Sequence, residues 1–259
     1  MSTIIINIFI GDIMFGWQAA LITFLIIWHF MGNFYSVYVH RGKGHNYFVF
    51  HPALEHFFRF WIWFTMAFSW PNWMQHYAAK HRKHHRYSDG PKDPHSPHHY
   101  TFAQMFDVSH SDPNRANYIS PEEVEEYASD VVSTNDWIER NLYCKYPRLG
   151  LQLMWLLQTI FFGWVGFVIG AGLYFGAKYI GIFFGNYIIH KVGFTYAGNV
   201  GTDRSRVLFP ISIFFGGEEI HAHHHIDASK PWFSRRWWEF DSGWMYCQIF
   251  IALKLMRLR

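Results

Sequence analysis

The chain has 259 residues, of which 51% are hydrophobic and 21% aromatic, while only 16% are charged. A soluble domain carries about 25% charged residues, so this composition favours a membrane-embedded protein. The net charge of +3 does not indicate a nucleic-acid-binding protein, because the basic residues lie beside histidines rather than in a tract of their own. The two cysteines are far apart and indicate neither a disulfide framework nor a thiolate metal site.

The first predicted element is an apolar helix over about residues 13–38, long enough to cross a bilayer core of about 30 Å. No Lys or Arg precedes Arg41, so the basic region of a secretory signal is missing, and we expect this segment to stay in the mature protein. We expect His29, inside the segment, to be packed in the core. The segment ends at His40-x4-His45, whose spacing places the two imidazoles about 140° apart on an ideal α-helix. The glycines between these histidines would let the helix end there.

The next apolar stretch, about residues 54–75, is strongly aromatic but contains Arg59 and Pro71. A full crossing would separate the histidines before it from those after it by the thickness of the bilayer. We therefore predict an interfacial or half-inserted helix. Three histidines of this region are expected to pack or to contact lipid headgroups: His51, His56 and His76.

Two segments repeat one histidine pattern, His81-Arg82-Lys83-His84-His85 and His221-Ala222-His223-His224-His225. On a helix, positions i, i+3 and i+4 share a face, so each segment would point three imidazoles the same way. By chance, a chain with this histidine content would contain roughly 0.1 such patterns. Imidazole is a ligand for iron, zinc, copper and nickel, so the two segments predict a transition-metal site.

Residues 76–148 are predominantly polar, and Ser120-Pro121-Glu122-Glu123 predicts a capped helix start. We expect the acidic run that follows to be a solvated helix face. Surface positions are expected for four further histidines of this segment: His95, His98, His99 and His110.

A second apolar block, residues 149–190, is rich in glycine and fits two helices joined tightly near Gly170–Gly176. Two crossings would return the chain to the side that it left. Asn186 and His190, four residues apart, would share a helix face at that end. An ionisable residue in such a position is a functional candidate.

Of the 22 Lys and Arg residues, all but Arg59 and Lys178 lie in blocks that hold or follow the histidines. By the positive-inside tendency, segments 76–148 and 191–259 are cytosolic. We predict an all-α, polytopic membrane protein that forms a single domain over residues 1–259. Its cytosolic helical cap would hold the histidine-rich di-metal site.

These segments resemble the histidine boxes of the membrane fatty acyl desaturases, the family that contains stearoyl-CoA desaturases and bacterial acyl-lipid desaturases. His40-x4-His45 resembles the first box, His81 to His85 followed by Asp93-Pro94-His95 the second, and Gly217-Glu218-Glu219-Ile220-His221-x-x-His224-His225 the third. Asn186-x3-His190 matches the asparagine and extra histidine that these enzymes supply from a transmembrane helix.

Further motifs fit the bacterial acyl-lipid Δ9 subgroup: His51-Pro52, His56-Phe57-Phe58-Arg59-Phe60-Trp61 and Trp237-Trp238-Glu239-Phe240-Asp241-x-Gly243-Trp244. The chain departs from the family at Ala222 and His223, where Asn or another polar residue is usual, and at Ile226-Asp227. His223 allows a second register, and we assign the third box to His221, His224 and His225 because that register repeats the second box.

The resemblance implies an O2-dependent desaturase that introduces a cis double bond, at Δ9 in this subgroup, into an acyl chain. It implies two iron ions, for which zinc can substitute in a purified sample, and no catalytic residue beyond the metal ligands. Asn186 would act through a bound water. The candidate metal-binding residues are His40, His45, His81, His84, His85, Asn186, His190, His221, His224 and His225. Five carboxylates are candidates to orient these imidazoles: Asp89, Asp93, Asp203, Glu218 and Glu219.

The implied partners are an acyl lipid or acyl-CoA, O2, the lipid bilayer and a separate electron donor of the ferredoxin, rubredoxin or cytochrome b5 type. The implied location is a membrane, the inner membrane in a bacterium, with several crossings and the active site on the cytoplasmic side. The motifs leave the substrate-binding residues unassigned.

Two other functions use the same pattern. A membrane di-iron hydroxylase would leave a hydroxylated alkyl or acyl chain without an alkene. A non-enzymatic zinc-binding membrane protein would purify with zinc and consume no O2, although the apolar blocks lack the acidic series that a transport pore would need.

Overall fold

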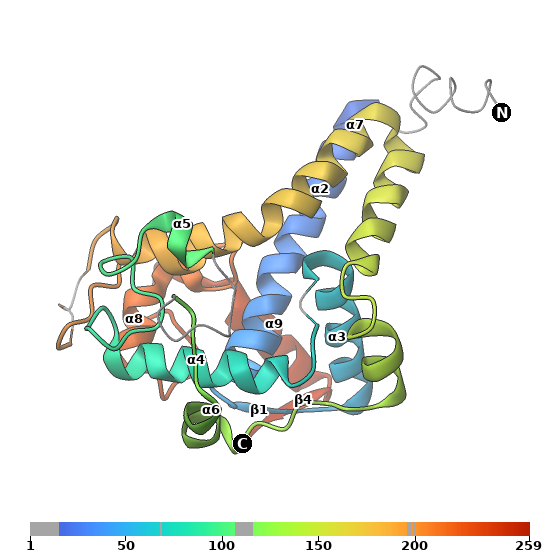
Figure 1. Cartoon of the computed structure of the whole chain (residues 1–259). Coiled ribbons are helices and arrows are strands. Elements are labelled where there is room, and N and C mark those ends of the chain that lie inside the picture. Colours follow the sequence, from blue (N-terminus) through green and yellow to red (C-terminus); the bar gives the residue numbers. More distant parts are fainter. Residues whose placement is uncertain (1–15, 68, 107–115, 196–197, 199) are drawn as a thin grey trace, which may run out of the picture.

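The protein is predominantly helical (Figure 1). The computed structural model describes residues 16–67, 69–106, 116–195, 198 and 200–259. Two long helices, α2 (Gly16–Phe34) and α7 (Leu149–Ile182), extend together from one end of the molecule. The other elements gather at the opposite end, among them α4 (Trp73–Tyr87) and α8 (His221–Ile226), which carry the repeated histidine pattern.

The first helix extends further than the sequence predicts. α2 continues into a π-helix, η1 (Tyr35–Gly44), whose backbone hydrogen bonds join residues five apart. The N–H of His45 donates to the carbonyl of His40 at 3.0 Å. The predicted end near residue 38 is therefore wrong, and residues 13–15 of that prediction lie outside the described part. Gly44 permits a close approach, because a Cβ there would lie 3.2 Å from the ring of His81.

The predicted helix over residues 54–75 is also wrong in extent. The structure has two helices instead, α3 (Pro52–Met66) and α4, which runs crosswise to α3 in Figure 1. Between them, Ala67 and Asn72 adopt left-handed backbone conformations, with φ of 54° and 61°. Residues in that region do not continue a right-handed helix, so the chain changes direction there.

Arg59 ties α3 to the following segment. Its guanidinium is buried and donates to Glu139 at 3.0 Å and to Asp136 at 2.5 Å. Glu139 begins a short π-helix, η2 (Glu139–Tyr143). Removing one partner of such a buried pair typically costs about 3–5 kcal/mol of stability. The charge in an otherwise apolar helix is therefore explained by packing.

The second apolar block reverses direction at Gly163, rather than near Gly170–Gly176 as the sequence predicts. Gly163 has φ 56° and ψ −137°, a conformation that glycine adopts far more readily than other residues. Gly170 instead packs on the first limb, since a Cβ there would lie 2.3 Å from Cδ1 of Trp155. By length and composition, Gly16–Gly44 could cross a membrane as one helix. Leu149–Gly176 is apolar over a similar length, but its reversal at Gly163 makes it a hairpin of two shorter limbs rather than a single span.

Short elements join the compact end. Strand β1 (Phe48–Phe50) pairs antiparallel with β4 (Met256–Leu258), and β2 (Ile211–Ser212) pairs parallel with β3 (Phe240–Asp241). The capped helix start predicted at Ser120 is confirmed, because Ser120 and Glu123 form a reciprocal capping box at α6. The remaining elements are α5 (Phe102–Met105), α6 (Pro121–Ala128), η3 (Phe183–Tyr187), η4 (Ile188–His190), η5 (Glu218–Ile220) and α9 (Ser242–Ala252).

A fully buried arginine fixes η1 against the C-terminal region. The guanidinium of Arg41 donates to both carboxylate oxygens of Asp241, at 2.8 and 2.9 Å, and lies 3.8 Å from the ring centroid of Phe233. The N-cap Gly217 of η5 lies against the same guanidinium, and its φ of 109° suits glycine. These contacts bring the first and third histidine segments together.

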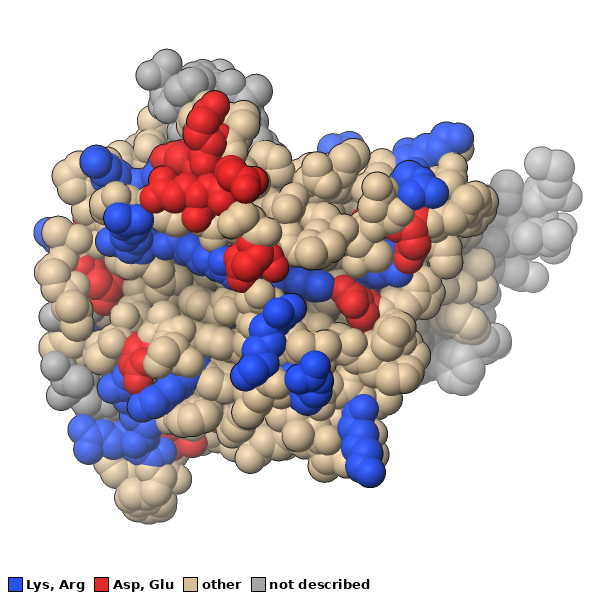
Figure 2. Space-filling view, turned by 90° about the horizontal axis from the view of Figure 1, so that it is seen from below, with Lys and Arg blue, Asp and Glu red and all other residues tan. Residues whose placement is uncertain are grey.

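The two ends of the molecule differ in surface character. Large apolar side chains are exposed along α2 and α7, including Trp17, Ile22, Ile26, Leu156, Ile160, Trp164 and Val168. Figure 2, viewed from the opposite end, shows rows of Lys and Arg with Asp and Glu beside them. Ion pairs near α4 and α6 contribute at this end, among them Arg82–Asp130, Lys83–Glu123 and Arg86–Glu126.

Candidate metal centre

Nine of the ten candidate residues are histidines, and the structure gathers them into two groups. The five-histidine group comprises His40, His45, His81, His85 and His224, and the four-histidine group comprises His84, His190, His221 and His225. Within each group, the ligand nitrogens lie within 4.8 Å of one another. The rings also interleave between groups, as His84 and His85 lie 4.9 and 4.3 Å from His225 by ring centroid.

The repeated pattern divides between the two groups in opposite ways. From α4, His81 and His85 join the five-histidine group and His84 joins the other. From α8, His221 and His225 join the four-histidine group, and His224 joins the five-histidine group. The three histidines of each helix share one face, as the sequence predicts, but they belong to two groups. Residue i+3 lies to one side of that face and residue i+4 to the other, so their rings can point to different groups.

The π-helix explains how His40 and His45 meet. Their ring centroids lie 5.2 Å apart, although five residues along an α-helix would separate them around the axis. In η1 the hydrogen bond from residue i+5 to residue i places the second histidine about one turn above the first. The helical segment ends at Gly44, one of the two glycines at which the sequence predicts an end, but it reaches that residue as a π-helix.

The Nε2 atoms face one another. In the five-histidine group, Nε2 to Nε2 distances are 3.0 Å for His40–His224, 2.8 Å for His45–His81, 3.1 Å for His81–His85 and 3.0 Å for His85–His224. In the four-histidine group, the same distance is 2.9 Å for His221–His225.

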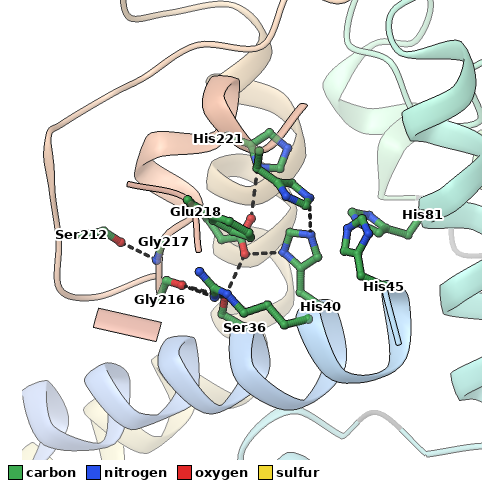
Figure 3. A network of polar contacts seen from close by, with 12 residues as sticks. Ser36, His40, His45, His81, Ser212, Gly216, Gly217, Glu218 and His221 are labelled. Carbon is green, nitrogen blue, oxygen red and sulfur yellow. Dashed lines mark hydrogen bonds and ion pairs between the residues drawn. The ribbon is translucent and has the colours of Figure 1, made fainter. Parts of the chain in front are cut away.

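Carboxylates meet the other ring nitrogen, Nδ1. Glu218 lies between the two groups, 2.5 Å from Nδ1 of His40 and 3.2 Å from Nδ1 of His221 (Figure 3). The other such contacts are His84–Asp93 at 2.9 Å, His190–Asp89 at 2.8 Å and His225–Asp203 at 2.9 Å. Four of the five carboxylates singled out from the sequence thus contact a histidine of the groups. Glu219 does not, and instead accepts from Ser212 and from the backbone N–H of Phe215.

This arrangement fits a bound cation. A neutral imidazole whose Nδ1 faces a carboxylate carries its proton on Nδ1, which leaves Nε2 as a bare acceptor. For His221 and His225, two such acceptors would face each other at 2.9 Å and repel unless a cation lies between them. Nε2 of His190 is buried without a hydrogen-bond partner among the described residues, which also fits a metal ligand.

Burial keeps most of these imidazoles neutral. It lowers the pKa of His45, His81, His85 and His224 well below the usual range, and neighbouring imidazoles add to the effect. Burial also lowers the pKa of His221 to about 4, against the opposing effect of Glu218. His84 differs, because although burial lowers its pKa, the charge and hydrogen bond of Asp93 outweigh burial and raise it. Neutral imidazole is the form that binds metal.

The other histidines occupy varied positions. His223 turns away from both groups, and its Nε2 lies 2.8 Å from Glu239. The surface position expected for His95 is wrong, since His95 is 4% exposed and its ring stacks on His84 at 4.3 Å. His98 and His99 are exposed as expected, His110 lies outside the described residues, and His29 contacts the hydroxyl of Tyr246 at 2.8 Å. His51 caps α3, while His56 stacks on Tyr143.

A cavity of about 170 Å³ borders both groups. Asn186 lines it together with His84 and His221, so the tenth candidate residue faces the same space. Much of the wall is apolar, from Trp28, Met31, Met66, Trp70, Trp73, Ile182 and Phe215. Sequence reasoning did not place several polar residues of the wall there, among them His76, Lys80, His95 and Asn117. The available signal was helical spacing, because His76 and Lys80 precede His84 by eight and four residues on α4.

Comparisons with known proteins find related sequences. The protein-family profile described as "Fatty acid desaturase" matches residues 15–239. Delta-9 acyl-lipid desaturase 1 of Arabidopsis thaliana is 27% identical over 244 residues, 89% of this chain and 71% of that protein. The sn-1 stearoyl-lipid 9-desaturase of Synechocystis is 26% identical over 94% of this chain and 72% of its own length. A hex-5-enoyl-acyl-carrier-protein acetylenase of Moorena producens is 30% identical over 69% of this chain and 58% of its own length.

Proposed function

The chain belongs to the fatty acid desaturase family, and from this premise we propose that it is an O2-dependent desaturase that introduces a cis double bond at the Δ9 position of an acyl chain. The acyl chain is carried by a membrane lipid or by CoA. Two relatives bear the names of acyl-lipid and stearoyl-lipid 9-desaturases, which supports this position and carrier class. At 26–27% identity, the proposal depends on the metal centre rather than on the names.

The observation that carries the proposal is the pair of facing Nε2 clusters, each suited to one metal ion. The five-histidine group would hold one ion. The four-histidine group would hold the other, with Asn186 binding a water in the remaining position. Iron, when bound, supplies the redox chemistry with O2 that removal of hydrogen from an unactivated methylene requires, whereas zinc has no redox chemistry.

The surrounding residues orient the imidazoles and shield them from water. Each carboxylate holds the proton on Nδ1 and so fixes the tautomer and the ring orientation. Glu218 does this for one ring of each group at once. The aromatic cavity wall would hold an alkyl chain beside both groups and keep bulk water away from it. Electrons come from a separate donor protein of the ferredoxin, rubredoxin or cytochrome b5 type.

The exposed apolar surface supports membrane insertion through α2 and α7. The charged end in Figure 2 would then face the cytoplasm, in agreement with the positive-inside tendency. We therefore propose an integral membrane protein with several crossings, in the inner membrane of a bacterium. Reporter fusions within residues 88–114 and at the C-terminus should both report the cytoplasm, and opposite sides would contradict this topology.

The decisive experiment is lipid profiling in a host that lacks its own desaturase. Expression of the wild-type chain should add one cis double bond, which mass spectrometry with double-bond localisation places at Δ9. The Glu219→Gln variant should behave like wild type, since Glu219 contacts no histidine of the groups. A hydroxylated chain without an alkene would replace the proposal with a hydroxylase.

The acetylenase relative favours one further product to look for, a triple bond in an acyl chain that already carries a double bond.

Metal analysis tests the alternative that the protein is a non-enzymatic zinc-binding protein. Purified protein should contain iron and consume O2 in the presence of an electron donor. Zinc alone, with no O2 consumption after iron reconstitution, would indicate a zinc-binding protein.

A further inference from the structure

One face of α4 forms a continuous wall of the cavity. The residues on this face recur every three or four positions, as expected for a helix: Trp73, His76, Tyr77, Lys80, His81 and His84. The wall therefore passes from an apolar end at Trp73 to the metal centre at His84. Lys80 lies between these ends, one helical turn, about 6 Å, before His84.

Lys80 is the only Lys or Arg among the described residues that line the cavity. Glu218 is the only carboxylate there, and its oxygens already contact His40, His221 and Ser36. Within the described residues, Lys80 has no ion pair or hydrogen bond. The neighbouring Lys83 differs, because its Nζ lies 2.5 Å from Glu123. Placing an amine against a largely apolar cavity costs free energy unless the amine is paired, so a ligand in the cavity that accepts its hydrogen bonds would be stabilised.

Two imidazole nitrogens at the cavity also lack a hydrogen-bond partner. Nδ1 of His76 and Nδ1 of His95 are buried and have no hydrogen-bond partner among the described residues. His76 lies one helical turn before Lys80 on α4, and the ring of His95 stacks on that of His84, one turn after Lys80. The amine of Lys80 can donate up to three hydrogen bonds to such a ligand. Buried polar groups are almost always satisfied, so two unpartnered imidazole nitrogens beside an unpaired amine at one cavity indicate that a hydrogen-bonding ligand is missing.

We propose that Lys80, assisted by His76 and His95, binds the carbonyl oxygen of the ester or thioester at the carboxyl end of the acyl substrate. This inference rests on the proposed function. It adds the residue that determines which methylene of the acyl substrate lies beside the metal centre. An alkyl chain contacts apolar walls without directional bonds, so its walls alone do not determine which methylene lies beside the imidazoles. A single polar anchor at a fixed distance from the metal centre would determine which methylene lies there.

Binding measurements test this anchor without turnover. The metal-loaded protein in detergent is titrated with methyl 9,10-dibromostearate, whose bromines quench tryptophan, and with 9,10-dibromooctadecane, which lacks the ester. Trp28, Trp70 and Trp73 line the cavity and report entry of either probe. The wild-type protein should prefer the ester by about ten- to a hundredfold, the range for a hydrogen bond to a charged group. Lys80→Met should bind both probes equally.

Lys83→Met is the matched control, because Lys83 lies on the same helix but pairs with Glu123 outside the cavity. It should keep the ester preference, and Lys80→Arg should restore much of it. His76→Phe gives a second, independent variant in case Lys80→Met does not fold, and should weaken the preference several-fold. Metal content of each variant should equal that of wild type. An unchanged ester preference in Lys80→Met, as expected if the three groups only bind water, would overturn the proposal.

Product analysis separates this inference from the proposed function. If wild type desaturates, Lys80→Met should give double bonds at several positions where wild type gives one. A single unchanged position in that variant would refute the anchor while leaving the desaturase intact. If wild type does not desaturate but shows an ester preference that depends on Lys80, the proposed function fails and the ester-binding subsite stands.

Discussion

The two histidine groups differ in how they are built as candidate cation sites. The five-histidine group has more imidazoles, but among the described residues only His40 has a carboxylate at Nδ1. The four-histidine group has fewer imidazoles, and each of them faces a carboxylate. A carboxylate at Nδ1 makes Nε2 a stronger donor to a metal. The five-histidine group would therefore bind a cation through a larger number of imidazoles, and the four-histidine group through fewer imidazoles that are each more basic.

The difference also determines where an open position lies. Five imidazoles surround the first site closely, whereas the second has four and borders the cavity wall that contains Asn186. With one imidazole fewer, the four-histidine group leaves the position that the proposal gives to a water held by Asn186. Glu218 is the only described carboxylate that contacts both groups, so it couples the orientation of their rings.

The largest effect is expected when an imidazole is removed from the smaller group. His84→Ala leaves three imidazoles there, whereas His85→Ala, a change at the adjacent residue, leaves four in the other group. His84→Ala should abolish desaturation and lose one metal ion per chain, while the protein still inserts into membranes. His85→Ala should retain more metal. Metal analysis and product analysis check both variants, and activity in His84→Ala would remove that residue from the ligand set.

A smaller effect, but one on both groups, is expected for Glu218→Ala. It removes the Nδ1 partner of one imidazole in each group, and loss of such a partner typically reduces metal affinity about 10- to 100-fold. Chelator titration should therefore show weaker binding of both metal ions. Glu219→Gln is the adjacent control. Weakening of only one ion would contradict the bridging role of Glu218.

Asp93→Asn should act on the four-histidine group alone. It weakens the contact to His84, so one of the two ions should be released about tenfold more readily in the same titration. Asp130→Asn is the matched control, because Asp130 contacts Arg82 and Asn46 but no histidine. Equal weakening of both ions in Asp93→Asn would contradict the separation of the two groups.

The smallest effect is expected for Asn186→Ala. Asn186 lines the cavity and is proposed to act through a water, whereas His190 contributes an imidazole to the four-histidine group. Asn186→Ala should therefore lower activity and leave metal content close to wild type, while His190→Ala should lower both. The reverse ranking in metal analysis would show that Asn186 binds more directly than proposed.

Local patterns in the sequence were enough to predict a metal site and the family. Imidazoles at i, i+3 and i+4 indicated metal binding because that spacing is local and any helix enforces it. The capped start of α6 and the apolar character of α2 and α7 are likewise local properties. The predicted helix ends were wrong at η1, α3 and α7, where a π-helix, two left-handed residues and Gly163 depend on neighbouring packing.

By contrast, the division of the histidines between two groups and the carboxylate that contacts each ring become visible only in the folded chain. Glu218 contacts His40 across 178 residues of chain, and Asp89 contacts His190 across 101. Such pairs leave no periodic trace in the sequence, because they depend on how helices pack after they form. The cavity wall with Lys80 has the same origin, since its residues come from separate elements that meet only in the folded chain.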